Sequence, residues 1–152
     1  MNEILLWLFV LNLGIACGAG LYEHRIVASG WVTFSPSGAH WHAEVAQRDD
    51  SGRRFWAFVT TIPLTLLTLA NLYAASQSAG PVRSWWLAAG LFALADRLLT
   101  FVYFIPTLVW LMKAADSPKS AAAAIRWRRL NYLRHAIVFA AWLASLRVLE
   151  RF

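Results

Sequence analysis

The chain has 152 residues, of which 59% are hydrophobic and 14% are charged. Soluble domains have roughly 45–50% apolar and about 25% charged residues, so this composition excludes a soluble globular protein, a disordered chain and a coiled coil, and leaves a membrane protein. The formal net charge of +6 comes from 14 Lys and Arg against 8 Asp and Glu. Because the basic residues of membrane proteins gather on cytoplasmic loops, the positive charge requires no nucleic-acid partner, and we expect none.

A membrane-spanning helix needs roughly 20 mostly apolar residues, because the hydrocarbon core is about 30 Å thick. Four stretches of the chain meet this requirement, namely 4–22, 55–75, 85–112 and 130–149. We interpret the first as a retained helix and not a cleaved signal, because no Lys or Arg precedes Arg25. The third is longer than a span requires, and Pro106 marks a place where its backbone hydrogen bonding can break. The sequence predicts a single all-α transmembrane domain, residues 1–152, built as a four-helix bundle.

The first loop is long, and the third is basic. Within the first loop, the segment Ser35-Pro36-Ser37-Gly38 predicts a turn, and residues 39–47 have the composition of a short helix at the membrane interface. Residues 121–124 of the third loop are all alanine and lead into a basic segment, which predicts a helical approach to the last span.

The distribution of basic residues predicts the orientation. The loops after the first and third spans hold nine Lys and Arg, namely Arg25, Arg48, Arg53, Arg54, Lys113, Lys119, Arg126, Arg128 and Arg129. The opposite side holds only Arg83, Arg147 and Arg151. We therefore expect loops one and three in the cytoplasm and both termini outside, in the cytoplasmic (inner) membrane of a bacterium.

Small residues predict where the helices touch, since helices in lipid associate where backbones can approach closely. The spacing of Gly14 and Gly18 in the first span, and of Ala136, Ala140 and Ala144 in the fourth, favours contacts within the bundle or between copies in a homo-oligomer. Five tryptophans near span ends are expected to anchor the protein in the headgroup region, namely Trp56, Trp85, Trp86, Trp110 and Trp127.

Two charged residues lie inside the third span, where such groups face the bundle interior or a wet cavity. Asp96 follows Trp85 by 11 residues, which places it about 16 Å along the helix, close to the membrane midplane. Arg97 is its neighbour, but adjacent helical positions do not face each other. We therefore expect each to have a partner on another helix, in a buried charge network of Asp96, Arg97 and Arg134. If these groups only hold the helices in register, the pairs would be Asp96 with Arg134 and Glu23 with Arg97.

Other polar residues converge on the same region. The four-span topology brings the end of the first span and the start of the fourth to one membrane face, and the residues concerned are Glu23, His24, Asn131, Arg134 and His135. Together with Tyr103 they predict a polar cavity in the cytoplasmic half of the bundle. The alternative is a set of buried ion pairs that only hold the helices in register.

A metal site is a narrower form of the cavity hypothesis. His24, His40, His42 and Glu44 are its candidate ligands, because the first loop can fold back over the mouth of the cavity. Histidine and carboxylate ligands suit iron or copper, and paired histidines suit haem. The alternative is that the loop histidines are ordinary interface residues, and the cofactor then remains unknown or is none.

Two motifs carry a resemblance to a known family. Residues 18–24 read GAGLYEH at the end of the first span, and residues 127–134 follow the pattern W-x-x-L-N-x-x-R at the start of the last. With the four-span topology, they resemble the anthrone-oxygenase-like family, small membrane proteins mostly of unknown function. The resemblance implies oxidation of a lipid-soluble polycyclic phenol by dioxygen. In that chemistry His24, Glu23 or His135 removes a proton from the acidic carbon, and Arg134, Asn131 or Tyr103 stabilises the enolate oxygen.

We therefore expect an oxidoreductase-like or oxygenase-like pocket for a hydrophobic aromatic or lipid-like small molecule, in a protein surrounded by membrane lipid. One alternative is a non-enzymatic membrane subunit or lipid-binding partner of a larger complex. Another is a haem-binding or metal-binding membrane redox protein.

Overall fold

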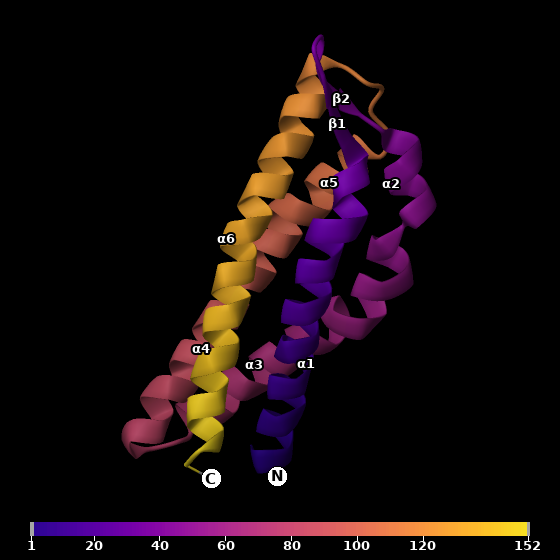
Figure 1. Ribbon diagram of the computed structural model, residues 1–152. Coiled ribbons are helices and arrows are strands. Elements are labelled where there is room, and N and C mark those ends of the chain that lie inside the picture. The colour runs from indigo at the N-terminus through magenta and orange to yellow at the C-terminus, as the bar shows by residue number, and fades with distance from the viewer. Residues whose placement is uncertain (1, 152) are drawn as a thin grey trace.

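A computed structural model describes residues 2–151 of the chain. Four long helical rods lie side by side, with both chain ends at one end of the bundle and a small hairpin at the other (Figure 1). Four helical stretches are long and apolar enough to cross a membrane, namely Glu3–Trp31, Gly52–Ser76, Gly80–Leu111 and Pro118–Leu149. This confirms four helices of spanning length, as expected for a membrane protein, and each is longer than the range predicted from sequence.

The first half of the chain forms two of the rods and the hairpin between them. Helix α1 (Asn2–Tyr22) continues through a π-helical segment (Glu23–Val27) and a 3₁₀ turn (Ala28–Trp31). Strands β1 (Val32–Ser35) and β2 (Gly38–Trp41) and the short helix α2 (Ala43–Asp49) follow. The second rod consists of a π-helical segment (Gly52–Thr61) and α3 (Ile62–Ser76).

The second half forms the other two rods. Helix α4 (Gly80–Leu99) leads into a π-helical segment (Thr100–Phe104) and then into α5 (Ile105–Leu111). The last rod is a single helix, α6 (Pro118–Leu149), which begins at a capping box in which the side chains of Ser117 and Ser120 each bond the other's backbone.

Prolines explain two of the three π-helical segments. Pro63 and Pro106 each lie two residues after the end of such a segment, and a proline has no N–H to donate to the carbonyl four residues earlier. For Pro63 that carbonyl belongs to Val59, and it accepts a hydrogen bond from Asn12 Nδ2 of α1 at 2.8 Å. The expected break in the third span therefore lies immediately before Pro106.

The first loop is more regular than expected. The turn at residues 35–38 is confirmed as the tip of an antiparallel hairpin that pairs Val32 with Trp41 and Ser35 with Gly38. Gly38 has a φ of +135°, which side-chain-bearing residues rarely adopt. The helix expected at 39–47 is wrong for its first residues, which form β2, and correct for residues 43–47; α2 extends two residues further, to Asp49. The described chain is thus predominantly helical, as the predicted bundle requires, with one short two-stranded hairpin added.

The hairpin is fastened to the loop between α5 and α6. The indole N–H of Trp41 donates to the Leu111 carbonyl at 2.9 Å, and the Trp41 backbone N–H donates to Asp116 Oδ1 at 2.8 Å. His40 Nδ1 lies 2.9 Å from the other carboxylate oxygen of Asp116. These bonds join two loops that the sequence separates by more than seventy residues.

Burial of tryptophan corrects the anchoring prediction. Trp86 and Trp127 are almost fully buried, whereas Trp85 and Trp110 are exposed as anchors would be. The Trp86 indole N–H donates to Asn71 Oδ1 at 2.9 Å inside the bundle. Trp127 packs with Trp31 of the 3₁₀ turn and with Phe104, and Trp31 in turn meets Trp41 of the hairpin. This aromatic cluster closes the hairpin end of the bundle.

The small residues bring α1 and α6 together as predicted, but at only some of the expected positions. A Cβ at Gly14 would lie 3.4 Å from the Trp142 ring, while nothing lies within 4 Å of one at Gly18. On α6, Ala144 is buried and Ala136 is exposed. The buried stripe there is rotated from the predicted one and includes Val138, Ala141, Ala144 and Val148.

The Asp116 carboxylate makes the attachment of the hairpin dependent on pH. Hydrogen bonds from the Trp41 backbone N–H and from His40 hold the pKa of Asp116 below its usual value, which is about 3.9. Because the folded-state pKa is lowered, the ionised carboxylate stabilises the attachment at a pH above the ordinary pKa. This stabilisation is lost as the pH falls through the folded-state pKa. We expect the hydrogen-exchange protection of the Trp41 amide, corrected for the intrinsic rate, to fall below about pH 4. Asp116→Asn removes this dependence, and Glu44→Gln, which changes an exposed carboxylate of α2, leaves it intact.

Candidate functional site

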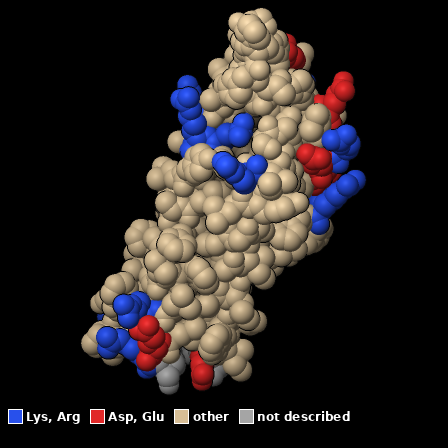
Figure 2. Space-filling model, in the orientation of Figure 1, with Lys and Arg blue, Asp and Glu red and all other residues tan. Residues whose placement is uncertain are grey.

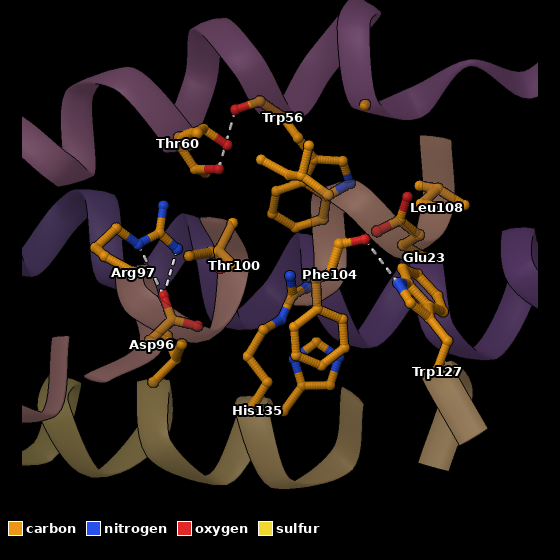
Figure 3. A pocket seen from close by; sticks show the side chains of 16 residues that line it. Glu23, Trp56, Thr60, Asp96, Arg97, Thr100, Phe104, Leu108, Trp127 and His135 are labelled. Atoms are coloured by element: carbon orange, nitrogen blue, oxygen red, sulfur yellow. Dashed lines mark hydrogen bonds and ion pairs between the residues drawn. The ribbon is translucent and has the colours of Figure 1, made fainter. Parts of the chain in front are cut away.

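A partly open cavity of about 70 Å³ lies between the helices, on the inner side of the aromatic cluster (Figure 3). Its polar lining consists of Glu23, Thr60, Thr61, Asp96, Arg97, Thr100, Arg134 and His135. Its remaining wall is aromatic and aliphatic and includes Trp56, Phe104, Trp127 and Val138. This volume admits a few water molecules or the polar end of a larger molecule.

All three π-helical segments contribute to this cavity. Glu23 begins the first, Trp56 and Thr60 lie in the second, and Thr100 and Phe104 are the ends of the third. A π turn widens the helix and displaces side chains from their α-helical positions, and such turns occur frequently at functional sites. Sequence reasoning missed Trp56, Thr60 and Trp127 as lining residues. Pro63 and Pro106 are the sequence signal that points to two of these segments.

Asp96 and Arg97 bond directly to each other, which corrects the expectation that neighbouring residues on a helix need partners elsewhere. Asp96 Oδ2 accepts from Arg97 Nε at 2.9 Å and also from Nη2 of the same guanidinium. Both side chains are almost completely buried. The long Arg97 side chain folds back along its own helix, at the point where α4 gives way to the π-helical segment.

The other expected ion pairs are not formed. Glu23 accepts a hydrogen bond from the Ser51 hydroxyl and not from Arg97. Among the described residues Arg134 belongs to no ion pair. Its guanidinium carbon lies 4.7 Å from the ring centroid of Phe104 and 6.0 Å from that of Trp56. Cation–π attraction therefore holds this charge against the aromatic wall, and the carboxylates of Asp96 and Glu23 act on it from a greater distance.

Four buried polar atoms of the lining have no hydrogen-bond partner in the described chain, namely Asp96 Oδ1, Arg97 Nη1, Thr100 Oγ1 and His135 Nε2. Buried polar atoms are nearly always hydrogen-bonded, because leaving one unpaired costs about 1–3 kcal/mol. Arg97 Nη1 is a hydrogen-bond donor and Asp96 Oδ1 is an acceptor, whereas the Thr100 hydroxyl and His135 Nε2 can each donate or accept. It suits water or a ligand that carries an oxygen atom.

His135 owes its position to a glycine. A Cβ at Gly20 of α1 would lie only 2.4 Å from His135 Cε1, so the imidazole fits only because Gly20 has no side chain. The His24 ring lies next to the His135 ring, with centroids 6.1 Å apart. It also contacts the Tyr132 ring, with centroids 4.1 Å apart. The two histidines thus come together, but only His135 lines the cavity.

The remaining candidates lie elsewhere. Asn131 is fully buried with both amide atoms unpaired, but it is outside the cavity lining. Tyr103 faces a separate groove between α5 and α6. Of the predicted catalytic set, the cavity therefore collects Glu23, Arg134 and His135, and it adds Asp96 and Arg97 from the predicted charge network.

The predicted metal ligands are not assembled. His40 pairs with Asp116, His42 Nε2 lies 2.8 Å from Thr33 Oγ1, and Glu44 is exposed on α2. His24 instead contacts rings of α6. Between residues 2 and 151 no group of three or more His, Cys, Asp or Glu side chains is placed to hold a metal ion.

Comparison with known proteins adds no relative. No protein-family model, no curated protein and no solved structure matches the chain. The residues and geometry of the cavity are therefore the basis for any function proposed. Of the two motifs that resemble the anthrone-oxygenase-like family, Glu23, Trp127 and Arg134 line the cavity.

The contact between Gly20 and His135 gives a matched test with Gly18. Gly20→Ala forces the imidazole out of its place, and we expect a loss of about 1–3 kcal/mol in stability, typical of overpacking. Gly18→Ala is the control, because its Cβ meets nothing within 4 Å; its stability should stay within about 1 kcal/mol of the wild type. Thermal unfolding in a mild detergent measures both, and equal stability of the two variants would contradict the packing described.

Proposed function

We propose that the protein is an integral membrane protein that binds the oxygen-bearing end of a hydrophobic small molecule in its polar cavity and oxidises it. The four unpaired polar atoms of the lining, from Asp96, Arg97, Thr100 and His135, carry this proposal. A dry structural core would pair such atoms with one another, since an unpaired polar group in an apolar surrounding is costly. The basic residues of the hairpin end favour its placement in the cytoplasm of a bacterium.

The lining matches an amphipathic ligand. Arg97 Nη1 and the Thr100 hydroxyl can donate to one ligand oxygen, and the Arg134 charge favours that oxygen when it becomes negative. Trp56 and Phe104 offer aromatic faces for the hydrophobic body of the molecule. The lining also includes Ile105, which is 40% exposed, so the cavity opens beside α5. A hydrophobic ligand can enter there from the lipid, with its rings in the opening and its oxygen inside.

The family resemblance supplies a reaction that these groups can perform. His135 Nε2 is the proposed general base, which takes a proton from the acidic carbon of an anthrone. Donation from Arg97 and Thr100 stabilises the enolate oxygen that results. The enolate then reduces dioxygen, so that one anthrone and one dioxygen give one anthraquinone and one water. The carbon is oxidised, and both oxygen atoms are accounted for in the quinone and in the water.

Oxygen uptake with anthrone tests the proposal. We expect the purified protein in lipid nanodiscs to accelerate the conversion of anthrone to anthraquinone. His135→Gln should lower that rate about 100-fold or more, as loss of a general base does, and Arg134→Gln should lower it as well. Arg129→Gln, on the exposed face of α6, is the control and should retain the wild-type rate.

Binding separates the possible failures. If anthrone binds with the same affinity to the wild type and to His135→Gln but neither turns it over, the protein is a ligand-binding partner and not an oxygenase. If anthrone neither binds nor reacts, the proposed substrate class is wrong.

A further inference from the structure

A second hollow lies outside the cavity, on the lipid-facing side between α5 and the first turns of α6. This groove has a volume of about 630 Å³. One wall presents Tyr103, Pro106 and Trp110, and the other presents Lys119, Ala122 and Arg126. Its surface is largely apolar, with two cationic side chains along one edge.

The sequence of α6 explains the shape of the groove. Lys119 and Arg126 are seven residues apart, which is two helical turns, so they lie on the same face with about 10 Å of helix between them. Ala122 and Ala123 occupy that face between them. Because alanine has only a methyl group, α6 leaves open the space against α5 that larger side chains would fill.

The two cations are available to a ligand. Neither Lys119 nor Arg126 belongs to an ion pair within the part of the chain that the structure describes. Lys119 Nζ lies 5.9 Å from the ring centroid of Trp110, itself an exposed residue at the end of α5. Figure 2 shows Lys and Arg gathered over the upper part of α6, above a wide belt without charge. The groove therefore combines a largely apolar lining with two cationic side chains, Lys119 and Arg126.

We propose that this groove binds an acidic phospholipid, with its phosphate between Lys119 and Arg126 and an acyl chain along Pro106 and Ala122. The unpaired cations complement the negative headgroup, and basic grooves between helices near the membrane surface are suited to such lipids. The apolar floor favours a lipid over free phosphate, because a free ion would leave that floor uncovered. A zwitterionic lipid would bring its own cation close to the two basic side chains.

Native mass spectrometry of the delipidated full-length protein tests this site. Dioleoyl-phosphatidylglycerol and dioleoyl-phosphatidylcholine are the probes, because they share their acyl chains and differ in headgroup charge. We expect the wild type to bind phosphatidylglycerol more tightly than phosphatidylcholine. The double variant Lys119→Gln/Arg126→Gln should bind phosphatidylglycerol about tenfold more weakly and phosphatidylcholine as before.

A double variant of equal charge loss serves as the control. Lys113→Gln/Arg129→Gln removes two exposed basic residues near the same end but outside the groove, and it should bind like the wild type. Equal weakening in both double variants would show general electrostatic attraction and overturn the site. Ala122→Leu fills the groove and leaves the charges, so bound lipid should also fall; unchanged binding would exclude the groove. Competition by millimolar inorganic phosphate, which has the charge but no acyl chain, would identify a site for free phosphate and not for lipid.

Discussion

Asp96 and Arg97 lie almost fully buried in the middle of an apolar bundle, where every polar atom without a partner costs free energy. Their mutual hydrogen bonds satisfy one carboxylate oxygen and two guanidinium nitrogens, but Asp96 Oδ1 and Arg97 Nη1 remain unpaired. The next helical turn adds the unpaired Thr100 hydroxyl. These groups line a cavity, and their remaining hydrogen bonds are not made by other groups of the described chain.

The backbone provides that room through its irregular segments. Three π-helical turns face the cavity, and two of them precede prolines that interrupt the regular hydrogen-bond ladder. Pro63 has no N–H to donate to the Val59 carbonyl. The Asn12 side chain donates to this carbonyl instead, so it is not left unpaired. At the hairpin end, Trp31, Trp41 and Trp127 seal the bundle, and Asp116 ties the hairpin to the opposite loop. This packing closes the hairpin end of the bundle above the cavity.

Composition and hydropathy made the four helices of spanning length predictable, because hydropathy over about 20 residues reflects the thickness of a bilayer. The topology also brought Glu23, Arg134 and His135 to one site, since it determines which helix ends meet. The Asp96–Arg97 bond was not predictable from helical spacing, because it depends on how a long, flexible side chain folds back. The contact of His40 with Asp116 joins distant loops through a hairpin that composition alone did not distinguish from a helix. Trp127 has the sequence position of an interface anchor, but packing against Trp31 and Phe104 buries it.

The most direct test of the central claim, that the buried cavity exists to hold an oxygen-bearing molecule, is a crystal structure from a lipidic mesophase that resolves ordered water. We expect non-protein density within hydrogen-bond distance of Arg97 Nη1, Thr100 Oγ1 and His135 Nε2, either water or the head of a bound molecule. A closed cavity in which these atoms bond to one another, with no density between them, would contradict the claim. The charged residues would then only hold the helices in register.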